Sequence, residues 1–275
     1  MVQSPEHLYH ALVAGIRQFF EKAGIERAVL GLSGGIDSAV VLCLSVDALG
    51  KERVHTLLMP SPFSTVHSVT DAVKLAEQEE VSYHVIPIDS IYHKFLKELA
   101  PAFGHTHPDV TEENIQARIR ATLLMAYANK KGHILLNTTN KSELAMGYGT
   151  LYGDLAGALM VLADIYKTQV YDVAMFLNSE TQRIPISIMS KEPSAELRID
   201  QKDSDSLPPY SILDPVLFAL IEEGEAPESI IAKGAAKETV TQIVKTMNSN
   251  AFKFLQLPPL IQLSEHPLLP KEKWR

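Results

Sequence analysis

The sequence predicts an α/β fold: a single domain of three layers, with helices on both faces of a mostly parallel sheet. Two observations lead to this class. Short apolar segments typical of buried strands alternate with longer segments of helical periodicity, which is the order of βαβ units. The chain has 275 residues, 46% of them hydrophobic, which suffices for one large core. We therefore expect one domain over residues 1–275.

The first half of the chain starts with an amphipathic helix. Ser4 is a typical N-cap and Pro5 fits a first helical turn. Apolar side chains from Leu8 to Ile16 then recur on one helix face. Three short apolar runs predict buried strands, and Gly50 is expected to end the helix between the first two. The predicted order is helix 5–23, strand 28–32, helix 38–49, strand 54–58, helix 69–80 and strand 83–88.

A longer helix opens the second half. We expect Thr111 to cap it, Glu112 and Glu113 to interact favourably with its dipole, and Gly132 to end it. One more apolar strand and three helical segments follow. The predicted order is helix 111–131, strand 133–137, and helices 167–177, 213–223 and 237–247. Residues 251–275 are rich in proline, and no regular structure is predicted there.

Residues 183–210 interrupt this pattern. They contain prolines at 185, 193, 208 and 209 and a charged run over 200–205. A long segment without regular structure inside a compact domain is usually disordered or acts as a functional lid. We expect 183–210 to be a mobile loop that orders over the active site.

The composition excludes several classes of protein. Lys and Arg total 25 against 33 Asp and Glu, a formal net charge of −8, which argues against a nucleic-acid partner. The one cysteine, Cys43, excludes a disulfide framework within the chain and is expected to be a buried apolar residue of helix 38–49. No signal peptide or membrane span is recognised, so we expect a cytoplasmic protein without a membrane partner.

The strongest functional signal is the loop Ser33-Gly34-Gly35-Ile36-Asp37-Ser38, between the first strand and the second helix. The glycines allow the backbone to approach an anion, and the loop N–H groups with the helix N-terminus form a phosphate site. We expect the two serine hydroxyls to add donors. Asp37 would repel a bare phosphate but suits a Mg²⁺ that bridges it to phosphates. The alternative is a tight structural turn with Ser38 as helix cap.

Two better-known glycine motifs are excluded or weak. The chain has no GxxxxGK[ST] sequence and therefore no Walker-type loop. No GxGxxG follows the first strand, and Gly147, Gly149 and Gly153 miss that spacing by one residue, so a Rossmann dinucleotide site is weakly supported. The pair His105 and His107 is interpreted as loop rather than as a metal site.

The SGGxDS loop resembles that of the PP-loop ATP-pyrophosphatases, whose fold is that of the adenine nucleotide alpha hydrolases. Members of this superfamily cleave ATP between its α- and β-phosphates, adenylate a substrate oxygen, and let a nitrogen or sulfur nucleophile displace AMP. A second set of motifs is similar to NAD synthetases. These motifs are residues 137–148, 153–154, 164–168, 192–197 and 200–203. The resemblance extends from the first helix to about residue 260.

The resemblance implies a reaction and a set of site residues. The reaction is ATP + deamido-NAD + NH₃ → AMP + PPi + NAD, through an NAD-adenylate. Asp37, Glu143 and Lys167 are the implied catalytic residues, with Asp37 and Glu143 as ligands of Mg²⁺. The implied ATP-binding residues are Gly31, Leu32, Ser33, Gly34, Gly35, Ile36, Asp37, Ser38, Met59, Thr138, Lys167 and Ser194. The implied deamido-NAD-binding residues are Arg118, Phe252 and Lys253.

Four of these residues also have a plain structural interpretation. Glu143 could be a solvated acid at a helix start. Lys167 could be a surface lysine at a helix start, although the helix dipole disfavours a cation there. Arg118, taken without the resemblance, is best interpreted as an exposed helix residue. Met59 could be a buried core methionine.

The sequence departs from the short ammonia-dependent enzymes at several deamido-NAD contacts. Leu151 and Ala158 stand where those enzymes have a Lys and an Asp, and Phe252-Lys253 stands where they have His-Lys. Residues 150–154 are more similar to the synthetase half of glutamine-dependent enzymes. The dinucleotide contacts are therefore less well predicted than the ATP contacts.

The synthetase motifs occupy almost all of the chain, so we expect free ammonia as nitrogen donor, with a separate glutaminase acting in trans as an alternative. The resemblance also implies a homodimer. Two other functions stay open: another PP-loop ligase, such as one that modifies tRNA, and a non-catalytic sensor of adenine nucleotides. The sensor would need neither Glu143 nor Lys167.

Overall fold

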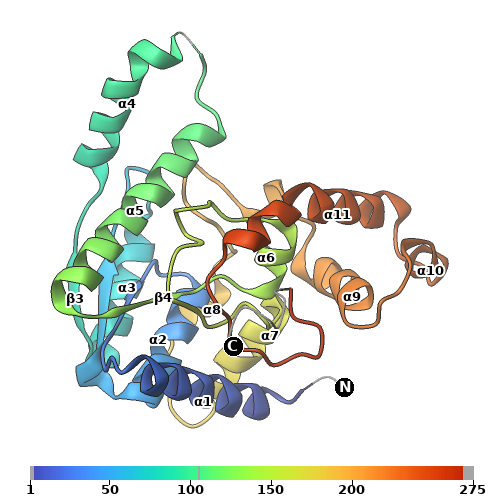
Figure 1. Ribbon diagram of the computed structural model, residues 1–275, viewed down its shortest axis with the longest axis horizontal. Helices are drawn as coiled ribbons and strands as arrows, with labels where there is room; N and C mark the ends of the chain where they lie inside the picture. Colours follow the sequence, from blue (N-terminus) through green and yellow to red (C-terminus); the bar gives the residue numbers. More distant parts are fainter. Residues whose placement is uncertain (1–2, 105, 269–275) are drawn as a thin grey trace.

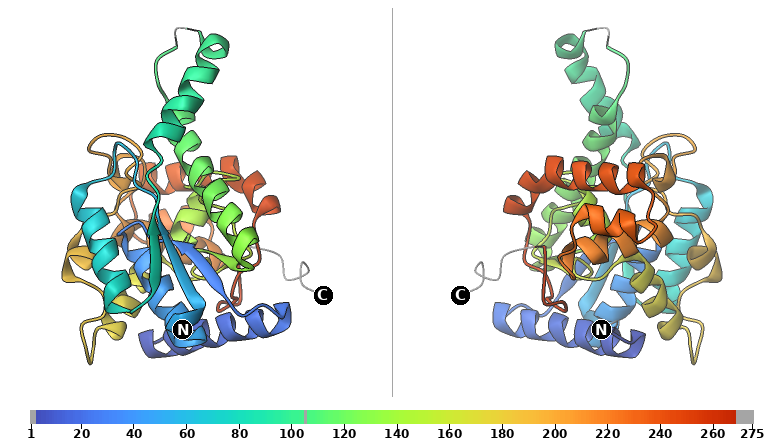
Figure 2. Two further views of the ribbon diagram at one scale, coloured as in Figure 1. Left: turned by 90° about the vertical axis from the view of Figure 1, so that its left-hand side faces the viewer. Right: turned by 90° about the vertical axis from the view of Figure 1, so that its right-hand side faces the viewer.

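A computed structural model describes residues 3–104 and 106–268, and it confirms the predicted fold class. Within the described residues, five parallel strands form one sheet in the order β3-β2-β1-β4-β5. The strands are β1 Ala28–Gly31, β2 Val54–Leu58, β3 Ser82–Val85, β4 Ile134–Asn137 and β5 Leu159–Met160. Helices cover both faces of this sheet (Figure 1, Figure 2).

The helices follow the alternation that the sequence predicts, with several additions. The α-helices are α1 Pro5–Ala23, α2 Ile36–Leu49, α3 Val66–Gln78, α4 Asp89–Phe103, α5 Val110–Lys131, α6 Lys141–Met146, α7 Lys167–Leu177, α8 Ile186–Ser190, α9 Tyr210–Ile221, α10 Pro227–Ala232 and α11 Lys237–Asn250. The 3-10 helices are η1 Lys51–Arg53, η2 Asp203–Asp205 and η3 Ala251–Gln256. No helix of the described residues is long and apolar enough to cross a membrane.

Side chains of the strands alternate between two cores. Ala28 and Leu30 of β1 face a core shared with α1, α2 and α7, whereas Val29 between them faces a core shared with α4 and α5. Successive side chains of a strand point to opposite faces, so a sheet covered on both faces has strands that are apolar throughout. This explains the continuous apolar runs at β1 and β4, whereas β3 at the edge of the sheet is mostly exposed and less apolar.

The order of the strands determines where a ligand can bind. From β1 the chain builds β2 and β3 on one side, then crosses to build β4 and β5 on the other. In open α/β sheets, ligands bind beyond the carboxyl ends of the strands at such a reversal. The glycine-rich loop follows β1 and Thr138 follows β4, so the reversal brings these two predicted site segments together.

Several predicted boundaries are wrong, for local reasons. Helix α2 begins at Ile36 rather than Ser38, because Gly35 is its N-cap and Asp37 already lies in its first turn. Helix α5 is capped by Asp109, whose side chain accepts a hydrogen bond from the Thr111 N–H, so Thr111 is not the cap. Helices α3 and α9 both begin three residues earlier than predicted.

Other elements were not predicted. Helix α4 projects from the body together with the start of α5 (Figure 1), and β5 has only two residues. Helix α8 and the 3-10 helix η2 lie inside residues 183–210, which therefore are not devoid of regular structure. The 3-10 helix η3 lies at the start of the proline-rich C-terminal segment.

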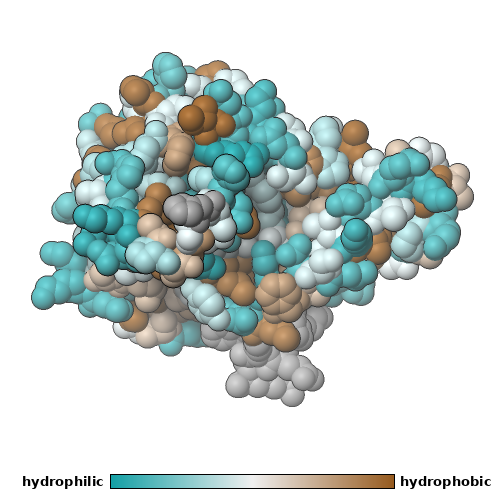
Figure 3. Space-filling view, turned by 90° about the horizontal axis from the view of Figure 1, so that it is seen from above, coloured by the Kyte–Doolittle hydropathy of each residue, from teal (hydrophilic) through white to brown (hydrophobic). Residues whose placement is uncertain are grey.

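Helices α9, α10 and α11 form a C-terminal lobe with a core of its own. Leu213, Leu217, Val240 and Ile243 are buried there against one another and against Tyr166 of the main body. Figure 3, a view from above, shows the lobe projecting from the body with mostly hydrophilic or neutral residues on its surface. Its inner side contacts α6 and α7, which carry two predicted site residues.

A cluster of aromatic and histidine rings lies toward the amino end of the sheet. His55 of β2 stacks on Tyr127 of α5 with 4.5 Å between ring centroids, and its Nε2 lies 2.8 Å from Nδ1 of His84. Burial, together with the neighbouring His84, His133 and Lys131, lowers the pKa of His55 to about 4. His55 is 4% exposed and is therefore neutral in the folded protein at neutral pH.

This cluster predicts a loss of stability in mild acid. The unfolded chain takes up a proton at His55 near pH 6.5, whereas the folded chain does so only near pH 4, so stability is full above pH 6.5 and falls below it. Between pH 7.5 and 5, the free energy of unfolding should fall by about 2 kcal/mol more in the wild type than in His55→Gln. Urea unfolding at both pH values measures this, and equal losses in both proteins would contradict it.

Candidate active site

A cavity of about 1400 Å³ opens at the carboxyl edge of the sheet, where the strand order reverses. Its wall comes from the loop after β1, the segment after β4, one side of α5, and residues 188–206. Every residue predicted for the site lines this cavity except Gly34. The sequence therefore predicted residues that the fold does bring together.

Gly34 shapes the loop instead of lining the cavity. Its φ is +78°, a conformation that favours glycine, and a Cβ there would lie 2.2 Å from the carbonyl oxygen of Ser68 in α3. The backbone of the loop is therefore in direct contact with the first turn of α3. This contact places the loop N–H groups next to the N-terminus of α2.

The two loop hydroxyls bond within the loop. The Ser38 hydroxyl donates to the Gly35 carbonyl at 3.0 Å and accepts from the Ser33 N–H at 3.3 Å. The Ser33 hydroxyl accepts from the Gly35 N–H at 3.2 Å. In this arrangement the two hydroxyls stabilise the turn. The Ser38 hydroxyl already donates within the loop, and Ser38 is not the helix cap.

Three charged side chains meet beside this loop. Asp37 comes from the first turn of α2, Glu143 from the first turn of α6, and Lys167 is the first residue of α7. The Lys167 ammonium donates to Oδ2 of Asp37 and lies 3.4 Å from Oε1 of Glu143. It is 2% exposed. We refer to Asp37, Glu143 and Lys167 as the charged triad.

The electrostatics of the charged triad couple Glu143 to the arrival of a divalent cation. Burial disfavours the ammonium, but Asp37 and Glu143 outweigh it and raise the pKa of Lys167, so Lys167 stays charged. Burial and the Asp37 carboxylate raise the pKa of Glu143 to about 8, so Glu143 is mostly protonated at neutral pH. A divalent cation beside Asp37 and Glu143 would stabilise the ionised form of Glu143 and displace its proton.

The donor set fits a magnesium ion held jointly with a phosphate ligand. Among the described residues, no group of three or more His, Cys, Asp or Glu side chains could hold a metal alone. Mg²⁺, however, is commonly bound by one or two carboxylates and completed by phosphate oxygens and water. Asp37 and Glu143 can supply that pair.

Glu143 is held in place by a capping box at the start of α6. Asn140 is the N-cap: its side-chain oxygen accepts from the Glu143 N–H at 3.0 Å, and its side-chain amide donates to Oδ1 of Asp37 at 3.0 Å. Glu143 is therefore a helix-start acid and a member of the charged triad at once. Asn140 was not predicted for the site, although the Asn-x-x-Glu spacing is a recognisable capping signature.

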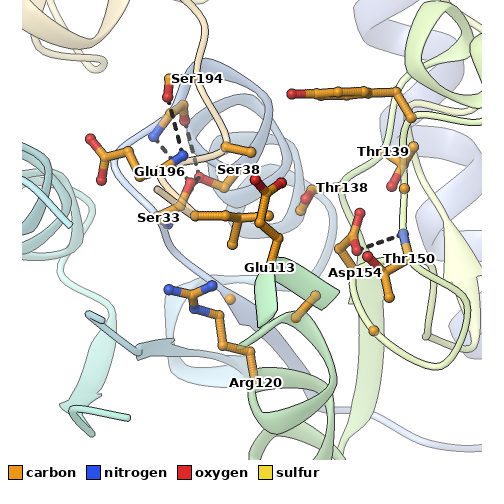
Figure 4. Close-up of a pocket in the computed structure, with 18 of the residues that line it drawn as sticks. Ser33, Ser38, Glu113, Arg120, Thr138, Thr139, Thr150, Asp154, Ser194 and Glu196 are labelled. Atoms are coloured by element: carbon orange, nitrogen blue, oxygen red, sulfur yellow. Dashed lines mark hydrogen bonds between the residues drawn. The ribbon is translucent and has the colours of Figure 1, made fainter. Parts of the chain in front are cut away.

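A second unpredicted residue is Arg120 of α5. Figure 4 shows its guanidinium pointing into the cavity, and its Nε donates to the carbonyl of Met59 at 3.0 Å. Burial lowers the pKa of Arg120 to about 10. Met59 is 8% exposed, so it is buried and lines the cavity as well.

Residues 188–206 form the wall opposite the sheet and are attached to α3. Glu196 accepts hydrogen bonds from Ser68 at 2.6 Å and from Lys191 at 2.7 Å. The predicted residue Ser194 donates to the carbonyl of Gln201 at 2.5 Å and lies near Ser33 and Ser38 (Figure 4). Lys191 adds a positive charge that the sequence analysis missed.

The residues predicted to bind the dinucleotide lie along another part of the cavity. Arg118 donates from Nε to the Leu151 carbonyl at 3.3 Å. The Lys253 ammonium donates to the carbonyls of Gly147 and Gly149 at 2.6 and 2.8 Å, so it also holds the glycine segment together. Phe252 is 56% exposed.

Two remaining predictions concern single residues. Cys43 is buried in α2, as expected. His107 lies in a loop, as predicted, whereas His105 lies outside the described residues.

Comparisons with known proteins agree on one family. Residues 8–258 match the family model described as NAD synthase. The chain is 46% identical over 260 residues to a protein named glutamine-dependent NAD(+) synthetase of Synechocystis sp., covering 94% of this chain and 47% of the relative. It thus spans about half the length of that relative.

Two solved structures of NAD synthetases are similar to the chain. One is a glutamine-dependent NAD+ synthetase from Acinetobacter baumannii in complex with ADP, with a TM-score of 0.68, 40% identity, and coverage of 97% of this chain and 48% of that one. Another is an NH3-dependent NAD synthetase from Campylobacter jejuni, with a TM-score of 0.74, 30% identity, and coverage of 92% and 96%.

The contact between Gly34 and Ser68 predicts different costs at two neighbouring glycines. Gly34→Ala should lower the free energy of unfolding by about 3 kcal/mol, because the new side chain meets backbone at a positive φ. Gly35→Ala is the matched control. Its φ is −94° and its Cβ would lie 3.3 Å from the Ser33 hydroxyl oxygen, so about 1 kcal/mol is expected for the weaker cap. Urea unfolding without nucleotide measures both, and equal costs would contradict the loop geometry.

Proposed function

The chain belongs to the NAD synthase family, and from that premise we propose that it converts deamido-NAD to NAD with ATP and ammonia, releasing AMP and pyrophosphate. The observation that carries the proposal is the charged triad beside the glycine-rich loop. It lies where ligands of open α/β sheets bind, in a cavity of about 1400 Å³. A cavity of that size can hold two nucleotides in contact.

The triphosphate of ATP is proposed to bind along the loop from Ser33 to Ser38. The loop N–H groups and the N-terminus of α2 stabilise negative charge there. Lys167 is buried, charged and directed at the same place, so it neutralises charge that develops on the leaving pyrophosphate. Lys191 is placed to contribute a second positive charge from the opposite wall.

Magnesium would be held by Asp37 and Glu143, and when bound it would neutralise phosphate charge at the scissile bond. In its absence the Lys167 ammonium bridges the same two carboxylates. We therefore propose that Lys167 shifts toward the phosphates as the metal and nucleotide enter. Met59, with Thr138 after β4, would contact the rest of ATP.

The reaction is proposed to take two displacements. A nicotinate carboxylate oxygen of deamido-NAD forms a bond to the α-phosphorus of ATP, and the bond to the β-phosphate oxygen breaks, releasing pyrophosphate. Ammonia then forms a bond to the carbonyl carbon of this NAD-adenylate. The carbon–oxygen bond breaks, AMP leaves with that oxygen, and ammonia loses a proton. No side chain is assigned as the base.

Deamido-NAD is proposed to lie against Arg118, Phe252 and Lys253. Ala158, by contrast, packs against the main core, so it supplies no polar contact where short ammonia-dependent enzymes have an acid. Leu151 likewise supplies no charge where those enzymes have a lysine, and Arg118, whose Nε donates to the Leu151 carbonyl, is the proposed source of positive charge there. The family resemblance further suggests a homodimer with the dinucleotide at its interface.

Residues 183–210 are proposed to close over the bound substrates. They already contribute Ser194 and Glu196 to the cavity wall. Closure would keep water from hydrolysing the adenylate before ammonia arrives. Ammonia is the nucleophile of this proposal, and a glutaminase acting in trans could supply it.

A product assay tests this function. The 275-residue protein, given ATP, Mg²⁺ and deamido-NAD, should form NAD in the tube with ammonium and none in the tube with glutamine. Lys167→Met should lower the rate at least about 100-fold, because it removes a charge that stabilises the leaving pyrophosphate. Chromatography of NAD and AMP measures both.

Lys51→Met is the control for loss of a lysine, since Lys51 is a partly exposed residue that pairs with Glu80 and does not line the cavity. It should keep the wild-type rate. ATP binding without NAD formation in any tube would contradict the proposed substrate, and NAD from glutamine alone would contradict ammonia as donor.

A further inference from the structure

A buried polar network lies behind the charged triad, outside the cavity. Ser142 stands next to Glu143 in α6, and its hydroxyl oxygen accepts from the Lys167 N–H at 2.9 Å. The same hydroxyl donates to Oδ1 of Asp214 in α9 at 2.6 Å. Oδ2 of Asp214 accepts from the Thr168 N–H at 2.8 Å. The first turns of α6 and α7 are thus joined through one carboxylate.

The neighbouring residue Lys141 forms a second buried link between α6, the segment before α7, and the end of α9. It is fully buried and donates to Oδ1 of Asp164 at 2.8 Å and to Glu222 of α9. Its own N–H donates to the Ile165 carbonyl at 2.8 Å. A buried lysine is stable only when its charge is paired, so this ion pair fixes α6 against the segment before α7 and against α9.

Asp214 bonds to Ser142 of α6 and to the Thr168 N–H of α7, the helices that carry Glu143 and Lys167. It is 4% exposed and does not line the cavity, so it cannot touch a substrate there. The N–H groups at the start of α7 have no partners within the helix, and Asp214 and Ser142 satisfy two of them. The Asp214 carboxylate therefore fixes the position of the Lys167 backbone, at the start of α7, relative to Glu143.

We propose that Asp214 is a positioning residue. It holds Lys167 and Glu143 at the separation that the nucleotide phosphates require for binding. This rests on the proposed function, because it assumes that the charged triad receives ATP. The effect is confined to the phosphates. Residues that would contact the adenosine part, such as Met59 after β2 and Arg120 in α5, have no hydrogen bond to this network among the described residues.

The test compares Asp214→Ala with Asp214→Asn. Alanine removes both acceptors, so affinity for ATP with Mg²⁺ should fall about 10- to 100-fold. Losses of this size follow the removal of residues that hydrogen-bond to metal ligands. Affinity for adenosine should stay unchanged. Asparagine keeps an acceptor for the Thr168 N–H and should recover most of the loss. Calorimetric titration with ATP and with adenosine measures both ligands.

Val240→Ala is the control for a merely structural effect. Val240 is fully buried in the same lobe core as α9 but takes no part in the network. It should lower stability and leave both affinities unchanged. Equal losses for ATP in Asp214→Ala and Val240→Ala, or a parallel loss for adenosine, would overturn the proposal.

The outcome is separable from that of the proposed function. Failure of the wild type to make NAD, with phosphate-selective losses in Asp214→Ala, would contradict the reaction and keep the positioning role. Normal NAD formation by the wild type, with unchanged ATP affinity and KM in Asp214→Ala, would support the reaction and contradict the positioning role.

Discussion

The buried ammonium of Lys167 is the constraint on which the site depends. A charge that is removed from water must be paired, and Lys167 finds its partners on two other helices, Asp37 of α2 and Glu143 of α6. Because α2 follows the glycine-rich loop and α6 follows β4, this pairing joins the two sides of the strand reversal. The same pairing places Glu143 beside Asp37, where a divalent cation that arrives with phosphate would stabilise the ionised form of both groups.

Behind that ion pair, the protein supports the helix starts with buried polar groups in addition to apolar packing. Asp214, Ser142 and Lys141 satisfy N–H groups and charges that could find no water there. Such networks are costly unless every member is bonded, and in return they fix the positions of the helix starts. The C-terminal lobe, which carries Asp214 and Glu222, is thereby part of the site although it does not line the cavity.

The fold class and the glycine-rich loop could be predicted because their signals are local, whereas Glu143 and Lys167 were assigned through the resemblance to NAD synthetases. Apolar runs that alternate with helical segments predict strands buried on both faces, and the SGGxDS loop is recognisable from six consecutive residues. Helix α4 was missed although it is amphipathic, because its N-cap is Ile88, whose side chain makes no capping hydrogen bond, so the usual start signal is absent. Arg120, Lys191 and Asp214 were missed because their roles depend on partners far along the chain. Ser38 was misjudged because the helix starts two residues earlier than its polarity suggests.

The central claim is that this site activates a carboxylate through the α-phosphate of ATP. Deamido-NAD labelled with ¹⁸O in its nicotinate carboxylate tests it directly, with mass spectrometry of the AMP and pyrophosphate formed in the presence of ammonium. Attack by the carboxylate on the α-phosphorus predicts one ¹⁸O in AMP and none in pyrophosphate. Unlabelled AMP, or label in pyrophosphate, would contradict the account.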